Sequence, residues 1–186
     1  MYVGRLQSLK GVDVAIRTLK ELEDRKVTLL IVGGASGADG DAHEQNLREL
    51  MEKLPVHNQV IFIPPQPHHV LSTYYRASDL VLVPSRSESF GLVALEAAAC
   101  GTAVVASNVG GLRDNVADGI TGLLVNERDP ELFAAAVDQL LDDSEMRCEM
   151  GRQGALRASL NSWDLGAANA IEVFGRLTSK ELVSCA

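Results

Sequence analysis

The chain has 186 residues, of which 46% are hydrophobic and 23% charged, a composition typical of one soluble globular domain with a substantial core. Its net charge of −8 excludes a general nucleic-acid-binding surface, which needs a basic face. No apolar run approaches the roughly 20 residues of a membrane span, although association with a membrane surface stays open. We therefore expect a cytoplasmic protein. The three cysteines, Cys100, Cys148 and Cys185, are far apart in the sequence and are expected to be reduced thiols.

Short apolar runs alternate with amphipathic segments of helical length over the first two thirds of the chain. Strands are expected at residues 1–4, 27–32, 60–63, 80–83, 103–106 and 122–125. Helices are expected between them at residues 12–25, 42–54, 69–77, 90–100 and 112–117. Continuous apolar runs such as VTLLIVG, which begins at Val27, favour strands buried on both faces of a parallel sheet.

From Pro130 onward the strand signals stop, and three further helices are expected at 130–141, 144–160 and 162–177. The alternation of strand and helix predicts right-handed βαβ crossovers. The expected fold class is therefore α/β: a doubly wound, Rossmann-like parallel sheet of about six strands with additional C-terminal helices, in one domain over residues 1–186. Because residues 1–4 look like the end of a buried strand with no lead-in, we expect a domain cut from a longer chain.

In doubly wound sheets, ligands bind beyond the carboxyl ends of the strands, where loops lead into helix N-termini. The candidate loops are residues 4–11, 33–41, 64–69 and 84–91. The first of them, GRLQSLKG, matches neither a P-loop nor the dinucleotide fingerprint. It offers two cations, Arg5 and Lys10, that could reach an anion held over the sheet. Taken alone, two such residues are more often solvated surface charges.

The stretch SRSESFGLVALEAAACG at residues 85–101 carries a stronger signal. A helix of small residues is expected to open at Phe90-Gly91 and to direct its free N–H groups into the crevice, which is an anion site built from backbone. Glu88 lies ahead of this helix and Glu96 about one and a half turns inside it, so each should meet a different part of a bound ligand. The alternative is that Glu88 only complements the helix dipole and that Glu96 is an ordinary helical side chain.

The stretch ESFGLVALE at residues 88–96 resembles the E-x7-E motif of the retaining glycosyltransferases of family four, which have the GT-B architecture. The surroundings agree in order and spacing: YVGRLQSLKG, LLIVGG, VIFIPPQPHHVLSTYYRASDLVLVPSRSESFG, EAAACGTAVVASNVGGLRDNVADGITGLLV and the closing SW. The resemblance covers all but the last ten or so residues. The features GRLQ-x-LKG, GG-x-SG and P-x-P resemble the branch that contains sucrose-phosphate synthases and inositol-phosphate N-acetylglucosaminyltransferases, and they favour the latter.

The resemblance implies a role for each matching position. Glu88 would meet hydroxyls of the donor sugar and Glu96 the ribose of the nucleotide, and a carboxylate that accepts two hydroxyl hydrogen bonds needs no cation. Arg5 and Lys10 would bind the diphosphate and stabilise the charge on the leaving group, so these two residues and Glu88 are the expected catalytic residues. The remaining donor-binding positions are Gly4, Gln66, Ser89, Phe90, Gly91 and Leu92. Gln66, where relatives often carry Arg, is expected to contact the base through its backbone.

Three further features are interpreted more simply. His68-His69 is not expected to bind metal, because adjacent side chains point apart and no third ligand is spaced nearby. Gly110-Gly111 is expected to form a tight turn near the phosphates, or else only to relieve backbone strain. Trp163 is expected to pack in the last helical segment.

The resemblance as a whole implies the donor-binding C-terminal domain of a retaining GT-B glycosyltransferase. The donor would be a nucleoside-diphosphate sugar, expected to be UDP-linked N-acetylglucosamine or glucose, and no cofactor or metal is expected. The partners would be this small-molecule donor and an N-terminal acceptor domain that the sequence lacks, so the isolated chain would bind donor without turnover. Two alternatives stay open: a nucleotide-sugar epimerase of GT-B fold, and a non-catalytic nucleotide-binding module.

Overall fold

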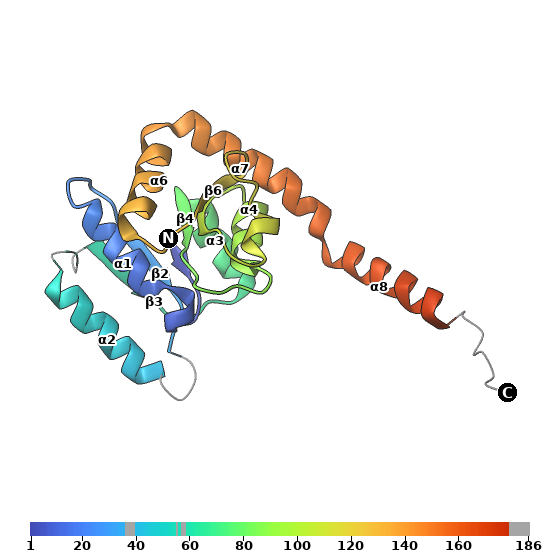
Figure 1. Ribbon diagram of the computed structural model, residues 1–186, viewed down its shortest axis with the longest axis horizontal. Coiled ribbons are helices and arrows are strands. Elements are labelled where there is room, and N and C mark those ends of the chain that lie inside the picture. The colour runs from blue at the N-terminus through green and yellow to red at the C-terminus, as the bar shows by residue number, and fades with distance from the viewer. Residues whose placement is uncertain (36–39, 55, 57–58, 179–186) are drawn as a thin grey trace.

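The computed structural model describes residues 1–35, 40–54, 56 and 59–178 (Figure 1). Its strands are β1 (Tyr2–Val3), β2 (Leu29–Val32), β3 (Val60–Ile63), β4 (Leu80–Val83), β5 (Ala103–Ser107) and β6 (Gly122–Val125). Its helices are η1 (Ser8–Lys10), α1 (Val12–Glu21), α2 (Gly40–Lys53), α3 (His68–Ala77), α4 (Leu92–Ala99), α5 (Leu112–Asn115), α6 (Pro130–Asp142), α7 (Ser144–Ala158), η3 (Ser159–Asn161) and α8 (Trp163–Thr178).

The strands form one parallel sheet in the order β3-β2-β1-β4-β5-β6. This is the strand order of a Rossmann-like doubly wound sheet, and the predicted fold class is confirmed. The order reverses between β1 and β4, so the loops that follow these two strands leave the sheet in opposite directions. A crevice opens between such loops at the carboxyl edge, which is where ligands of doubly wound sheets bind.

The sheet is buried on both faces because successive side chains of each strand point to opposite sides. In β4, Leu80 and Leu82 belong to a cluster with residues of α1, α2 and α6, whereas Val81 and Val83 belong to a second cluster with residues of α3, α4 and α5. Figure 1 shows α1, α2 and α6 on one side of the sheet and α3 and α4 on the other. These two apolar layers hold the strand ends, and thus the loops that follow them, in fixed positions.

The start of α4 differs from the prediction. The helix begins at Leu92, and Gly91 before it has a left-handed backbone with φ +87°. Phe90 and Gly91 therefore belong to the loop, because a residue with that φ cannot continue a right-handed helix. Glu96 consequently lies little more than one turn inside the helix.

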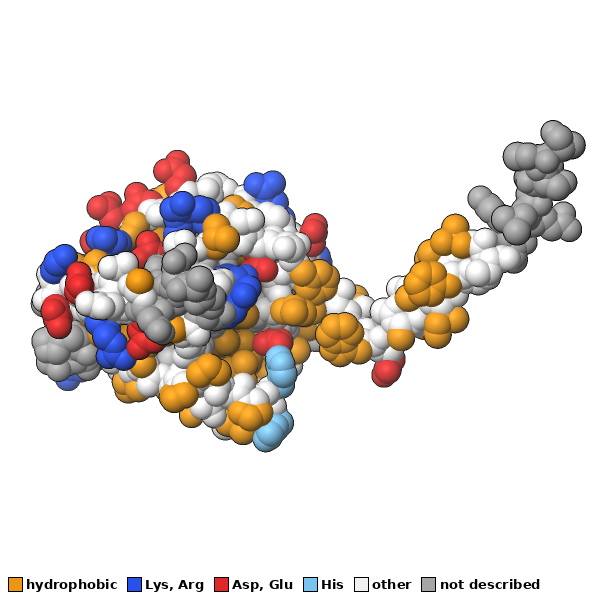
Figure 2. Space-filling model, turned by 90° about the horizontal axis from the view of Figure 1, so that it is seen from below, with side chains coloured by type: hydrophobic (Ala, Val, Ile, Leu, Met, Phe, Trp, Pro, Cys, Tyr) orange, Lys and Arg blue, Asp and Glu red, His pale blue; other side chains and the backbone are white. Residues whose placement is uncertain are grey.

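The prediction that Trp163 packs in the last helical segment is wrong. Trp163 is 87% exposed, and no residue of α8 is buried. Helix α8 continues from η3 away from the body of the domain, and its apolar side chains are visible on the surface of the protruding arm (Figures 1 and 2). Within the part of the chain that the structure describes, no helix is long and apolar enough to cross a membrane.

Candidate functional site

The loops that follow β1 and β4 are joined directly to each other. The Arg86 N–H donates to the Leu9 carbonyl at 2.8 Å. Gly11, with φ +71°, lies so close to β4 that a Cβ there would be 2.0 Å from the Pro84 carbonyl oxygen. Only glycine fits at this contact. The close approach brings η1, which ends at Lys10, next to the loop that carries Glu88.

Lys10 and Glu88 form an ion pair in this crevice. The Lys10 Nζ lies 2.7 Å from Glu88 Oε2, and their side chains are 26% and 14% exposed. The structure thus gives the Glu88 carboxylate a cation partner, which the sequence interpretation did not include. Because a lysine ammonium has three donors, Lys10 can keep this bond and still donate to an anion in the crevice.

Arg5 and Gln66 line a cavity of about 330 Å³ at the carboxyl edge of the sheet. Gly4 and Leu71 also line it, so it lies between the end of β1, the end of β3 and α3. Gln66 Nε2 donates to the Pro64 carbonyl at 2.9 Å, which folds the side chain onto its own loop. Arg5 is exposed, and among the described residues it forms no ion pair, so its guanidinium is available to an anion.

The approach to α4 is held by the turn at Gly110-Gly111. The Gly111 N–H donates to the Glu88 carbonyl at 3.0 Å, and a Cβ at Gly110, where φ is +46°, would be 2.0 Å from the same oxygen. Asn115 Nδ2 donates to the Phe90 carbonyl. The predicted tight turn is therefore present, and it fixes the backbone around Glu88.

The first N–H groups of α4 have no partners within the helix, as in every α-helix. Around this helix start, Ser89, Phe90 and Leu92 are exposed, whereas Gly91 is buried. Phe90 is 52% exposed and Leu92 49%, so two apolar side chains flank a start made of free N–H groups. Such an arrangement suits a ligand that has both an anionic group and an apolar surface.

Glu96 is held from the α3 side. The Tyr75 hydroxyl donates to Glu96 Oε2 at 2.9 Å, and His68 Nδ1 lies 3.3 Å from Glu96 Oε1. Burial, and then the negative charge of Glu96, raise the pKa of Tyr75, so the phenol stays protonated and remains a donor. This contact gives His68 a place beside Glu96 that the sequence pattern did not indicate. Among the described residues, no group of three or more potential metal ligands lies together.

The predicted residues thus fall into three neighbouring groups. Lys10 and Glu88 form a pair, Gly4, Arg5 and Gln66 share a cavity, and Glu96 lies on α4, whose start lies beside Glu88. The sequence interpretation missed the positions that hold them, Tyr75 and Asn115. No short motif marks either residue, because both act across contacts between segments more than 20 residues apart.

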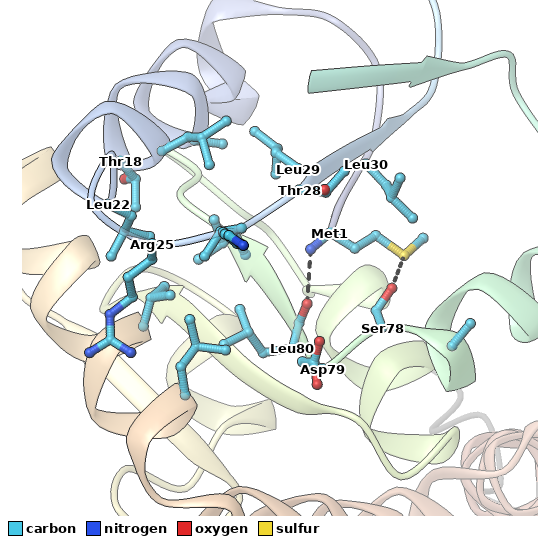
Figure 3. Close-up of a pocket in the computed structure, with 18 residues that line it drawn as sticks. Met1, Thr18, Leu22, Arg25, Thr28, Leu29, Leu30, Ser78, Asp79 and Leu80 are labelled. Carbon is cyan, nitrogen blue, oxygen red and sulfur yellow. Dashed lines mark hydrogen bonds between the residues drawn. The ribbon is translucent and has the colours of Figure 1, made fainter. Parts of the chain in front are cut away.

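A larger cavity, of about 580 Å³, lies at the opposite, amino edge of the sheet (Figure 3). Thr18, Leu22 and Arg25 approach it from the side of α1, and the Met1 nitrogen donates across it to the Leu80 carbonyl at 2.9 Å. None of the predicted site residues lines this cavity. Volume alone therefore does not locate the site, and the chemistry lies at the carboxyl edge.

Replacing Gly11 with alanine should destabilise the domain through the contact with Pro84. Gly101 is the matched control, since its φ of +76° is nearly the same but a Cβ there meets nothing within 4 Å. Gly101→Ala should cost about 1–2 kcal/mol for the left-handed backbone alone. Gly11→Ala should cost about 1–3 kcal/mol more, because the site is also overpacked. Urea unfolding of both variants measures the difference, and equal costs would show that the Gly11 contact is dispensable.

The sheet order, with cations, acids and a helix start gathered at its switch point, defines a Rossmann-like domain with a candidate anion-binding crevice. Comparison with known sequences agrees. The chain belongs to the family described as Glycosyl transferases group 1, which matches residues 1–157.

Curated relatives include the D-inositol 3-phosphate glycosyltransferases of Salinispora arenicola and Corynebacterium aurimucosum, each 44% identical over 99% of this chain. The chain spans 44% of each of these relatives, less than half their length. The sucrose-phosphate synthase of Thermosynechococcus elongatus superposes with a TM-score of 0.90 at 34% identity, covering 96% of this chain and 45% of the synthase. Anabaena Alr3699/HepE, solved in complex with UDP and glucose, gives 0.83 at 26% identity over 96% of this chain and 47% of its own.

Proposed function

We propose that this chain is the donor-binding domain of a retaining glycosyltransferase and that its crevice binds a UDP-sugar. The observation that carries the proposal is the placement of Arg5, the Lys10–Glu88 pair and the start of α4 together at the switch point of the sheet. Cations and free N–H groups there suit a diphosphate, and a carboxylate beside them suits sugar hydroxyls. The likeness to Anabaena Alr3699/HepE, solved with UDP and glucose, supports this ligand class.

The diphosphate would lie between the two cations and the helix start. During transfer, the bond between the anomeric carbon and the diphosphate oxygen breaks and its electron pair leaves with the diphosphate. An acceptor hydroxyl oxygen forms the new bond on the same face of the sugar, and its proton is released. Arg5 and Lys10 would stabilise the charge that develops on the leaving group, and the ion pair with Glu88 already holds Lys10 in position.

The two glutamates would bind different parts of the donor. Glu88, in the loop before α4, would accept hydrogen bonds from sugar hydroxyls while Lys10 continues to donate to its Oε2. Glu96, on the α3 side, would accept them from the ribose, and the backbone around Gln66 would contact the base. The donor would thus extend from the Lys10–Glu88 pair toward the end of β3.

The acceptor would be held by a second domain. The chain spans less than half the length of its curated relatives, and their names support an inositol phosphate as the acceptor. The exposed apolar side chains of α8 offer a surface for such a domain (Figure 2). The 186-residue chain alone should therefore bind donor without turnover.

Binding and turnover separate this proposal from its alternatives. Calorimetry should show that the chain binds UDP, UDP-N-acetylglucosamine or UDP-glucose, and binds ADP much more weakly. In the longer protein, UDP release that requires an acceptor would identify a transferase. Inversion of a sugar centre would identify an epimerase, and binding without either reaction would identify a non-catalytic module.

Nucleotide binding should not require a divalent metal, because the positive charges of Arg5 and Lys10 would neutralise the diphosphate. UDP affinity measured by calorimetry should be the same in EDTA and in magnesium. The sequence contains an Asp-x-Asp stretch at Asp39-Gly40-Asp41, and Asp39 lies outside the described residues. Should EDTA abolish binding and magnesium restore it, a variant with both aspartates replaced by alanine would show whether this stretch is responsible.

A further inference from the structure

Tyr75 connects α3 to the carboxylate that the proposed function assigns to the ribose. Its ring belongs to the apolar cluster between the sheet and α4, and the residue is 1% exposed. Its backbone carbonyl accepts hydrogen bonds from Thr102 Oγ1 at 2.8 Å and from the Ser78 N–H at 3.1 Å. The backbone of Tyr75 is therefore held by Thr102, just before β5, and by Ser78 after α3, and its ring is held by the core.

Glu96 depends on this anchor for its orientation. Helix α4 is otherwise built of apolar residues, LVALEAAA, so Glu96 is the one side chain in it that carries a charge. A glutamate side chain has several rotamers, and fixing one of them costs conformational entropy when a ligand binds. The Tyr75 hydroxyl at 2.9 Å fixes Oε2 before binding, whereas His68 is 90% exposed and its contact with Oε1, at 3.3 Å, is a weaker restraint.

The carboxylate retains acceptor capacity after both contacts. An ionised carboxylate has about four lone-pair positions, and Tyr75 and His68 use at most two of them. Glu96 is also about a third exposed, at 30%, so its remaining positions are open to solvent. A pair of neighbouring hydroxyls can therefore bind to the carboxylate without displacing Tyr75.

We propose that Tyr75 is a positioning residue, which orients Glu96 so that the carboxylate is ready to accept the hydroxyls of the donor's ribose. This inference rests on the proposed function. It assigns to a buried core tyrosine a share of nucleotide affinity, although Tyr75 itself does not touch the nucleotide. The competing interpretation is that Glu96 merely satisfies a buried phenol, as buried tyrosines require.

The test uses the 186-residue chain and four ligands: UDP, 2′-deoxy-UDP, 3′-deoxy-UDP and 2′,3′-dideoxy-UDP. Tyr75→Phe removes only the hydroxyl and should weaken UDP binding about five- to tenfold. The same substitution should change the affinity for the dideoxy ligand less than about twofold, because that ligand has no hydroxyl for Glu96 to accept. The monodeoxy ligands should show which hydroxyl carries the effect.

Tyr74→Phe is the matched control, since it removes a hydroxyl from the same helix one residue away, and it should leave all four affinities unchanged. In a Glu96→Ala background, Tyr75→Phe should have no further effect on UDP affinity. Thermal unfolding of each variant would detect a general loss of structure, which would lower the affinity for all four ligands equally.

Equal weakening of UDP and dideoxy-UDP by Tyr75→Phe would overturn the positioning role, and so would unchanged UDP affinity. Both outcomes leave UDP binding by the unmodified chain intact and so differ from a failure of the proposed function. If the unmodified chain binds no UDP at all, the proposed function is wrong and this inference is wrong with it.

Discussion

The double variant Arg5→Ala/Lys10→Ala is expected to bind UDP at least about a hundredfold more weakly than the unmodified chain. A hydrogen bond to a charged group contributes about 1.5–3 kcal/mol, and each 1.4 kcal/mol is a factor of ten in affinity. Each single variant should therefore lose about tenfold or more. Lys10 pairs with Glu88 whereas Arg5 lines the cavity at the end of β1, so the two residues occupy different parts of the crevice and their effects should add approximately. Calorimetric titration with UDP measures all three variants.

Lys20→Ala and Arg152→Ala are suitable controls, because they remove the same charges from surface ion pairs with Glu23 and Glu149. Surface pairs of this kind are worth about 0–1 kcal/mol, so neither control should alter UDP affinity. If Arg5→Ala and Lys10→Ala bind UDP as tightly as these controls do, the diphosphate does not lie between the two cations.

The second expected result separates the two glutamates. Glu96→Gln should weaken UDP and UDP-sugar alike by about tenfold, because an amide is a poorer acceptor than a carboxylate for the ribose hydroxyls. Glu88→Ala should leave the affinity for UDP unchanged and reduce only the affinity that the hexose adds in UDP-sugar. In the longer enzyme, turnover should then fall by about a hundredfold or more, a loss typical of removing a contact that stabilises the transition state.

The structure makes these two substitutions informative. Glu88→Ala leaves the backbone carbonyl that binds Gly111 in place, so the loop should keep its shape. The amide of Glu96→Gln keeps an oxygen that can accept from Tyr75. Binding of UDP and UDP-sugar to both variants gives four comparisons. If Glu88→Ala harms UDP binding as much as Glu96→Gln does, the assignment of sugar and ribose is wrong, and four unchanged affinities would make both glutamates structural.

The sheet could be predicted because its signal is local. Each strand buried on both faces reads as a short apolar run, and β4, LVLV, is buried at every position. The predicted start of α4 is too early, since Gly91 has a left-handed backbone and lies where an added Cβ would be 3.0 Å from Leu112 and 3.3 Å from Asn115, residues that follow the next strand. The helix-forming residues Leu92–Ala99 do not show where the helix starts.

The site could be predicted only in part. Motif spacing indicated Arg5, Lys10, Glu88 and Glu96, but not which of them touch. Lys10 and Glu88 are 78 residues apart in the sequence, and their contact depends on the closeness of Gly11 to Pro84. The error at Trp163 has a related cause, because an apolar residue in an amphipathic helix indicates packing only where a partner surface is present.

The exposure of Trp163 has a practical consequence for spectroscopy. The chain contains a single tryptophan, and it lies at the start of α8, outside the crevice. Intrinsic tryptophan fluorescence should therefore be silent when nucleotide binds, and a ligand titration followed by emission would report nothing. The same fluorophore is a clean reporter of α8, because any protein surface that covers this helix would remove Trp163 from water and shift its emission to shorter wavelength.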